Sequence, residues 1–415
     1  MRVIVVGGSI AGCTAAIELS RAGHEVTVIE RSRGGLKGRG AGIGTPIETL
    51  QTLVARDLID EATPRSVVSD LPLVGRKDEK DRYGHRALIL PLSMALLNWG
   101  DLWSQLRARV PSAAYMEGRT ITGAEQAEGE VVVSAADGWT ETCDLVLFAD
   151  GYRSIGRHLL FPNAELSYRG YVLWRGVLDE GRLSETGPLE TALYRLHYKG
   201  LPGNAVFYFV PGKDGSVEVG ERLVNWACYL PLAAEALPEF LVDRNGKRHD
   251  HSLPPGSMRT AEEKRLKDLM ADHLPSYFGE IISDSEDTFV QPIFSGTVPA
   301  YALGRRALLG DAGAVAPPFT GSGVFKAMMN AVELAASLAA RSSVDEALET
   351  WSAEQTKRGM RLAALGTQME TAFVWEAPDL SKMTESEARA WWTQSIAFPD
   401  EFSYVSEIEK QTPAS

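Results

Sequence analysis

The sequence predicts a mixed α/β protein, in which a nucleotide-binding domain assembled from discontinuous segments carries an inserted antiparallel sheet and a helical C-terminal segment. Three observations predict this class. A short apolar strand, a glycine turn and a helix open the chain at residues 2–21. A buried strand and a glycine turn recur at residues 307–313. Between them, alternating aromatic segments at residues 168–230 are typical of antiparallel strands.

Composition limits the classes of protein that fit. The 415 residues carry a formal net charge of −13, which argues against nucleic acid as a partner because a phosphate backbone needs a cationic surface. We find no signal peptide and no apolar run of the roughly 18 residues that span a membrane. Cys13, Cys143 and Cys228 stand far apart and indicate neither a disulfide framework nor a metal site. We therefore expect a cytoplasmic protein with no metal, no nucleic acid and no membrane partner.

Hydrophobic periodicity places the main elements. Residues 2–6 and 25–30 are typical of buried parallel strands around a helix at residues 11–21, which makes a βαβ unit. The glycine-rich residues 33–44 predict a loop. The remaining helices are expected at residues 46–58, 97–110, 260–273, 322–340 and from Ser343 onward, where Ser343 and Glu346 have capping-box spacing.

The α/β segments lie on both sides of the β-rich middle of the chain, so we expect discontinuous domains. The predicted boundaries are residues 1–78, 93–165 and 283–360 for the nucleotide-binding domain, residues 79–92 and 166–282 for the substrate domain, and residues 361–415 for the helical segment.

The first turn has a degenerate dinucleotide fingerprint. It runs Gly7-x-Ser9-x-x-Gly12, so a serine replaces the middle glycine of G-x-G-x-x-G. The turn follows a strand and opens a helix, whose N-terminus presents free N–H groups to a phosphate. Glu30 ends the next strand, where a carboxylate binds ribose hydroxyls. We interpret the turn as a working phosphate site; the alternative is a structural turn with a surface glutamate.

Two further motifs are weak alone. One is "DGYRSIGR", residues 150–157. The other begins at Gly310 and Asp311, where a buried strand ends in a carboxylate, and continues to Gly321 and Gly323 at the start of a long helix. An Asp at such a strand end can hold ribityl hydroxyls, and a helix N-terminus can stabilise negative charge on a reduced flavin.

Together the three motifs resemble the single-component FAD-dependent aromatic hydroxylases, the para-hydroxybenzoate-hydroxylase-like family. The second motif of that family, D-G-x-x-S-x-x-R, is matched fully. Its third, G-D-A-A-H with a later proline and G-Q-G-x-N, is matched at Gly310, Asp311, Ala312, Pro318, Gly321, Gly323 and Ala327, and departed from at Gly313, Ala314, Ser322 and Phe325. The segments "YRGYVLWRG", "RLVNWACY", "LPPGSMR", "TFVQPIF" and "WEAPDL" narrow the resemblance to the 2,6-dihydroxypyridine 3-hydroxylase branch.

The resemblance implies a discontinuous Rossmann-like FAD-binding domain with tightly bound, non-covalent FAD, and NADPH or NADH that binds transiently. It implies that Ser9 and Ile10 contact the pyrophosphate, that Arg107 approaches the phosphates, and that Asp150 organises the site. It implies a position near the reactive edge of the flavin for Pro318. The implied cofactor-binding residues are Gly7, Gly8, Ser9, Ile10, Ala11, Gly12, Glu30, Arg31, Arg39, Gly42, Arg107, Asp150, Asp311, Pro318, Gly321, Ser322, Gly323 and Val324.

The implied reaction is hydroxylation of an aromatic or heteroaromatic small molecule with NAD(P)H and O2, through a flavin C4a-hydroperoxide, by a monomer or homodimer. Such chemistry belongs to the cofactor, and the protein positions and shields it. Three alternatives stay open. The same reactive species serves epoxidation and ring-modifying steps in natural-product tailoring. An FAD-dependent oxidoreductase without oxygen insertion, or a flavin-bearing binding protein without turnover, would share the motifs.

The substrate side is less specific. A phenol needs a proton acceptor, for which His197, Tyr208 and Asn204 are candidates, although a lone His in a strand is more often structural. Arg175 either braces the flavin or meets an acidic substrate. An aromatic wall would exclude water, although such aromatic runs are more often sheet core. The candidates for this wall are Phe207, Tyr208, Phe209, Trp226, Tyr229 and Phe319. Strand alternation places Tyr208 on the same face as Val206 and Val210, and Phe207 and Phe209 on the other face. The residues expected to line the substrate pocket are Asn204, Val206, Trp226 and Phe319.

Overall fold

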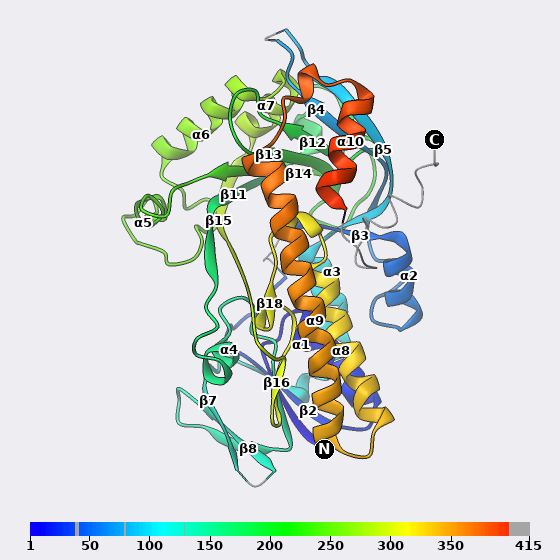
Figure 1. Cartoon of the computed structure of the whole chain (residues 1–415), viewed down its shortest axis with the longest axis vertical. Coiled ribbons are helices and arrows are strands. Elements are labelled where there is room, and N and C mark those ends of the chain that lie inside the picture. The colour runs from blue at the N-terminus through cyan, green and yellow to red at the C-terminus, as the bar shows by residue number, and fades with distance from the viewer. Residues whose placement is uncertain (38–40, 79, 128, 398–415) are drawn as a thin grey trace.

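The molecule is built around two large sheets that lie one above the other along its long axis (Figure 1). The computed structural model describes residues 1–37, 41–78, 80–127 and 129–397. A six-stranded sheet lies near the N-terminus, and a nine-stranded sheet lies at the opposite end. The expected mixed α/β class, with a parallel sheet, an inserted antiparallel sheet and C-terminal helices, is confirmed.

The six-stranded sheet is parallel except at one edge. Its order is β16-β17-β10-β1-β2-β6, and only the pair β16–β17 is antiparallel. The strands at its centre are short apolar runs buried on both faces, which is the pattern of a parallel sheet covered by helices. Their bounds are Arg2–Val6 (β1), Glu25–Glu30 (β2), Tyr115–Glu117 (β6), Leu145–Phe148 (β10), Ala302–Leu303 (β16) and Arg306–Leu308 (β17).

Helices pack on one another beside this sheet. Helix α1 (Ile10–Arg21) contacts both α3 (Trp99–Arg109) and α8 (Gly323–Ala340). Helix α9 (Val344–Glu370) runs beside α8 and continues toward the nine-stranded sheet (Figure 1). Its N-cap is Ser343, whose side chain accepts a hydrogen bond from the Glu346 backbone, as the capping spacing predicts. With 27 residues, α9 is about 40 Å long and connects the two sheets.

The nine-stranded sheet is almost entirely antiparallel. Its order is β18-β15-β11-β14-β13-β12-β4-β5-β3, with one parallel pair, β12–β4. Helices α6 (Thr260–His273) and α7 (Ser276–Asp284) cover one face, and α10 (Glu385–Ile396) packs against part of the other. The strands are Gly42–Pro46 (β3), Ser66–Gly75 (β4), His85–Asn98 (β5), Ser167–Asp179 (β11), Tyr194–His197 (β12), Asn204–Val210 (β13), Leu223–Pro231 (β14), Glu286–Thr297 (β15) and Ala314–Val315 (β18).

Membership of this sheet differs from the boundaries drawn on the sequence. Strands β3 and β4 lie within residues 1–78, and β15 lies within residues 283–360, yet all three pair into the large sheet. The predicted loop at residues 33–44 likewise ends in the first residues of β3. Local periodicity identifies a strand but not its distant partner, because pairing depends on contacts across the chain.

The remaining elements are peripheral. Among the helices in the described part of the chain, none combines the length and the apolar character of a membrane span. Strands β7, β8 and β9 form a separate three-stranded sheet. Their bounds, with those of the short helices, are Ile121–Ala127 (β7), Glu130–Ala135 (β8), Thr140–Cys143 (β9), Ile47–Ala55 (α2), Ile155–Leu160 (α4) and Leu237–Phe240 (α5).

A buried ion pair at the end of β14 generates a stability prediction. Arg222 donates to both oxygens of Glu180, and the two side chains are 7% and 0% exposed. Glu180→Ala should lower the free energy of unfolding by about 3 kcal/mol, because the buried Arg222 loses its one fully buried carboxylate partner. Glu190→Ala is the matched control, since Glu190 binds the same arginine but is 43% exposed; it should cost at most about 1 kcal/mol. Equal losses in urea titrations of the two variants would contradict this.

Candidate cofactor and substrate site

Three glycine-containing turns meet at one edge of the six-stranded sheet. Strands β1, β10 and β17 are parallel neighbours, so their carboxyl ends lie side by side. Gly7 follows the end of β1 directly, and one residue separates Asp150 and Gly310 from the ends of β10 and β17. Ligands of open α/β sheets bind at the carboxyl ends of the strands. Segments far apart in the sequence therefore form one site.

The first turn leaves no room for side chains at its glycines. Gly7 has φ +102, and a Cβ on Gly12 would lie 1.8 Å from the carbonyl oxygen of Gly7. A Cβ on Gly8 would lie 2.0 Å from the Tyr115 hydroxyl, which donates a hydrogen bond to the Gly8 carbonyl. The Ser9 side chain makes no capping hydrogen bond at the start of α1. Its hydroxyl is therefore available to a phosphate, beside the backbone N–H groups of the helix N-terminus.

Glu30 is buried rather than a surface glutamate. It is 6% exposed, and its two carboxylate oxygens accept hydrogen bonds from the backbone N–H groups of Gly8 and Ser32, at 2.9 and 2.8 Å. The carboxylate thus joins the glycine turn to the end of β2. This geometry does not fit the alternative of a turn with a solvated acid beside it.

In the second motif, Asp150 organises the start of α4. One carboxylate oxygen accepts the backbone N–H of Ile155 at 2.7 Å, whereas the other is buried and has no hydrogen-bond partner among the described residues. Burial raises the pKa of the Asp150 carboxyl, and hydrogen bonds from Ser154 and the Ile155 backbone oppose that rise. A buried polar atom without a partner is uncommon in a folded protein, so it indicates a place for a ligand group.

Arg157 joins the second motif to the third. Its guanidinium donates to the backbone carbonyls of Asp311 and Ala312, at 3.1 and 3.3 Å, and to the carbonyl of Tyr152. The Arg157 side chain is buried, and the Arg157 backbone N–H donates a hydrogen bond to the Ser154 hydroxyl, which caps α4. The arginine of the D-G-x-x-S-x-x-R motif therefore positions the turn that carries Asp311.

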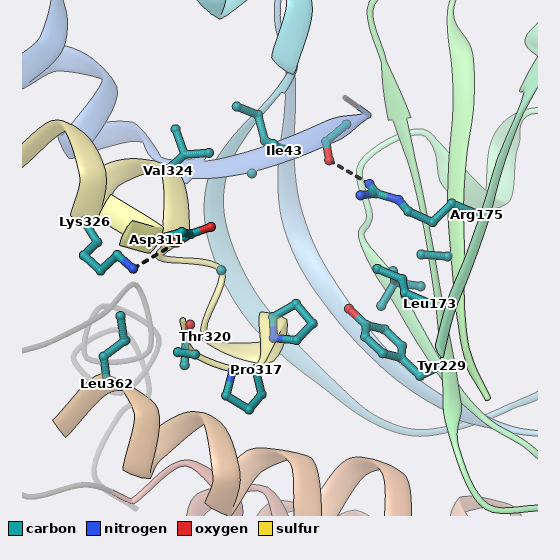
Figure 2. A pocket seen from close by; sticks show the side chains of 18 of the residues that line it. Ile43, Leu173, Arg175, Tyr229, Asp311, Pro317, Thr320, Val324, Lys326 and Leu362 are labelled. Atoms are coloured by element: carbon teal, nitrogen blue, oxygen red, sulfur yellow. Dashed lines mark hydrogen bonds and ion pairs between the residues drawn. The ribbon is translucent and has the colours of Figure 1, made fainter. Parts of the chain in front are cut away.

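The third motif opens into a cavity of about 310 Å³, which lies between the segment 311–326 and the nine-stranded sheet (Figure 2). Asp311 and the first turn of α8 form one side, and residues of β3, β11, β13 and β14 form the other. Asp311 pairs with the ammonium of Lys326 at 3.0 Å. Gly321 has φ +62 and terminates the turn at residues 318–320, and open space faces the Cα of Gly323. The open helix start can receive a negatively charged ring edge.

The opposite wall is apolar and aromatic, and strand alternation selects its residues. Val206 and Tyr208 of β13 line the cavity, while Phe207 and Phe209 belong to the core on the other face, as the alternation predicts. Leu173, Ala227 and Tyr229 complete the wall. Phe319 is 1% exposed and packs behind Tyr229 with ring centroids 4.4 Å apart. It is therefore a support for the wall rather than the pocket residue that we expected.

Gly42 is held at the rim of the cavity by three side chains of the large sheet. Its carbonyl accepts hydrogen bonds from the Tyr208 hydroxyl at 3.0 Å and from Arg175 at 3.1 Å, and its N–H donates to Asn225 at 3.0 Å. Figure 2 shows Arg175 reaching across to this carbonyl. Of the two roles considered for Arg175, the contact supports bracing the cofactor side. Arg39, also expected here, lies outside the described residues.

Several candidates from the sequence lie elsewhere. His197 is buried under the C-terminal segment, 3.2 Å from the Pro378 carbonyl and packed edge-on against Trp391. Asn204 is fully buried between Arg195 and the Phe373 carbonyl. Trp226 points to the α7 side of the sheet, where it donates to Ser285. None of these three lines the described cavity, so the expectation of a pocket or catalytic contact for them is corrected.

Other candidates are close to the site in different ways. Arg107 stacks over the Tyr115 ring at 4.0 Å and donates to the Val110 carbonyl, so it supports the first turn through Tyr115. Pro318 lines the cavity. Sequence reasoning missed Lys326, Ile43, Thr320 and Leu362, which also line it. For Lys326 a signal existed, since it falls in the first turn of the helix that the third motif opens.

The residues present fit FAD. The turn at Gly7–Gly12, the Glu30 carboxylate and the unpartnered Asp150 oxygen suit the dinucleotide, and the Asp311 cavity suits a ribityl chain and a flat ring. A family model for FAD-dependent oxidoreductases matches residues 2–65, and one for FAD binding domain-like sequences matches residues 168–295.

Curated relatives cover most of the chain. A 2,6-dihydroxypyridine 3-monooxygenase from Paenarthrobacter nicotinovorans is 28% identical over 366 residues, 86% of this chain and 88% of that protein. A salicylate hydroxylase from Pseudomonas putida is 23% identical over 91% of this chain and 87% of its own length. Both names describe oxygenation of small rings.

Solved structures share the fold. A 2,6-dihydroxypyridine-3-hydroxylase from Arthrobacter nicotinovorans has a TM-score of 0.83 and 24% identity, covering 97% of this chain and 98% of that one. HpxO from Klebsiella pneumoniae, in complex with FAD and uric acid, has a TM-score of 0.74 and 20% identity, covering 99% and 95%.

Fold, site and relatives thus define an FAD-dependent monooxygenase that uses NAD(P)H and O2. Within that class, the chain is most like aromatic hydroxylases among the relatives described above, in agreement with its motifs.

The buried His197 generates a prediction about pH. Burial lowers the pKa of His197 from 6.5 to about 4, the Arg195 charge lowers it further, and the Pro378 carbonyl opposes the shift. Between these values the unfolded chain binds a proton that the folded chain does not, so stability falls as pH drops from about 6.5 toward 4. Between pH 7 and pH 4.5 the free energy of unfolding should fall by about 2–3 kcal/mol less in His197→Gln than in the wild type.

Denaturant titrations at the two pH values measure this loss. His158→Gln is the control, because His158 is exposed and its replacement should leave the loss unchanged. A His197→Gln protein with the same pH dependence as the wild type would contradict the prediction.

Proposed function

We propose that this protein hydroxylates an electron-rich aromatic or heteroaromatic small molecule, with FAD as its resident, non-covalent cofactor. One observation carries the proposal. The cavity has a polar cofactor side, with Asp311 and the first turn of α8, and directly opposite it an apolar wall on which a second ring can lie (Figure 2). The names of the relatives, which include a dihydroxypyridine and a salicylate enzyme, support a small ring as the substrate.

Cofactor-binding roles follow from the contacts of each turn. Asp150 organises the start of α4, and Arg157 joins the second turn to the third. Glu30 and the neighbouring Arg31 flank the ribose, and Asp311 holds the ribityl chain. We propose that phosphates and ring are bound by Gly7, Gly8, Ser9, Ile10, Ala11, Gly12, Arg107, Gly42, Pro318, Gly321, Ser322, Gly323 and Val324.

When bound, FAD supplies hydride acceptance from NAD(P)H and the activation of O2 for transfer of one oxygen atom to the ring. The chain supplies shielding, because Leu173, Val206, Ala227 and Tyr229 give the cavity a wall that water does not solvate well. It also supplies orientation, since Tyr208 and Arg175 fix Gly42 at the rim. The proton acceptor for the substrate is not His197, which lies outside the cavity.

A cationic cluster offers a docking place for the dinucleotide phosphates of NADPH or NADH. Arg153 lies 5.9 Å from the centre of the Tyr152 ring, and the His251 ring packs edge-on against it at 6.1 Å. Burial lowers the pKa of His251, the charges of Arg153 and Arg31 lower it further, and the Asp250 carboxylate opposes the shift. In a chain with net charge −13, this cluster next to Asp150 suits a transient anionic partner.

We also propose a cytoplasmic location and a monomer or homodimer. The cysteines Cys13, Cys143 and Cys228 are all free and buried, and unpaired thiols are typical of a reducing compartment.

The test starts from purified protein, which should be yellow and contain about one FAD per chain. With phenols and hydroxypyridines as probes, NAD(P)H oxidation should be matched by oxygen uptake and by a product one oxygen atom heavier. Turnover that is unchanged without O2 would support an oxidoreductase without oxygen insertion and contradict the proposal. Retained flavin with no turnover on any ring would contradict it as well.

Asp311→Ala should lower FAD affinity at least about tenfold, the scale of losing one charge-assisted hydrogen bond of about 1.5–3 kcal/mol. Asp268→Ala is the control, since Asp268 lies on α6 in an exposed ion pair with Lys264 and should bind FAD like the wild type. An Asp311→Ala protein that retains full flavin content after dialysis would contradict the assignment of Asp311.

A further inference from the structure

A buried lysine is part of the cavity that the sequence motifs did not assign. Lys326 lies in the first turns of α8, and its side chain is only 8% exposed. Its ammonium is 3.0 Å from one carboxylate oxygen of Asp311 and also donates to the backbone carbonyl of Ala314. Both Lys326 and Asp311 line the cavity (Figure 2). Burying an ammonium group costs several kcal/mol of free energy unless the group is paired, and here Asp311 provides the pairing.

The Lys326–Asp311 pair keeps a hydrogen-bond donor and an acceptor that a ligand in the cavity can use. An ammonium has three N–H donors, and two acceptors for it are recorded among the described residues. Asp311 is 45% exposed, and its second oxygen has no donor among those residues. A carboxylate held through one oxygen keeps the other free to accept hydroxyl hydrogen bonds at a fixed orientation.

Position 314, whose carbonyl Lys326 binds, is an alanine, so no titratable side chain stands there. Lys326 reaches the backbone at that same position. Its full charge adds to the partial positive charge of the α8 N-terminus, and both act on one end of the cavity.

We propose that Lys326 is a positioning residue of the flavin site, which orients Asp311 through their ion pair and places a buried positive charge beside the cofactor. This inference rests on the proposed flavin site and deepens it. Two consequences follow. Loss of the ammonium frees Asp311 to rotate, which weakens FAD binding. Loss of the charge also disfavours the reduced, more negative cofactor, which lowers the midpoint potential.

The test compares holoenzymes of wild type, Lys326→Met and Lys326→Arg. Methionine keeps most of the side-chain volume without charge, and arginine restores the charge. Lys326→Met should stabilise the reduced flavin about tenfold less, a shift of about −30 mV for a two-electron couple, and Lys326→Arg should recover most of it. Dye-linked spectrophotometric reduction measures the potential. Lys264→Met is the matched control, because Lys264 forms an exposed pair with Asp268 and should leave the potential unchanged.

A second measurement separates positioning from a merely structural role. FAD affinity should fall about tenfold in Lys326→Met, and Asp311→Asn combined with Lys326→Met should bind no more weakly than Asp311→Asn alone, because the lysine acts through that carboxylate. Should Lys326→Met not fold, Lys326→Gln keeps a donor for the Ala314 carbonyl without the charge and takes its place.

An unchanged potential in the uncharged variant, or fully additive losses of FAD affinity, would overturn the inference. These outcomes presuppose a yellow wild type. A wild-type protein that binds no FAD would instead contradict the proposed function, so the two failures are distinguishable.

Discussion

The site depends on one side chain, the guanidinium of Arg157. The order of the parallel sheet brings the ends of β1, β10 and β17 side by side, but adjacency alone does not orient the turns that follow. Arg157 donates to the carbonyls of Tyr152, Asp311 and Ala312, so it holds the second and third motifs in one arrangement. Its planar fork suits this task, because several donors leave it in fixed directions. Glu30 fixes the first turn to the end of β2, because its carboxylate accepts the backbone N–H groups of Gly8 and Ser32.

The second half of the site comes from the large sheet, which approaches the cofactor turns through β3. Gly42 at the start of that strand is bound by side chains from β11, β13 and β14, so the rim of the cavity is fixed by the substrate-side sheet. The cavity is therefore bounded by a polar, charged side from the third motif and an apolar side from the large sheet. That division suits a reaction between two rings from which water must be excluded. Helix α9 spans both halves and packs against the turn at residues 318–320, which supports their relative placement.

Much of this could be predicted from sequence, because it depends on local signals. The βαβ start, the motif turns and the alternation that separates Tyr208 from Phe207 all follow from short-range periodicity and glycine placement. The failures depend on distant packing. Trp226 of β14 packs in the core beneath α7, so the opposite face of β14 lines the cavity. His197 is covered by residues near Pro378 and Trp391, almost two hundred positions later. Lys326 could be placed on a helix, but its burial against Asp311 follows only from the closure of the third motif.

The most direct measurement of the central claim is a crystal structure of the protein with FAD bound. The pyrophosphate should lie over the turn at Gly7 and Ser9, the ribityl chain at Asp311, and the flat ring in the cavity between Ile43 and Thr320. The apolar face of Leu173 and Tyr229 should then remain open for a second ring. Flavin density outside this cavity, or a bound FAD that leaves either Gly7 or Asp311 uncontacted, would contradict the account.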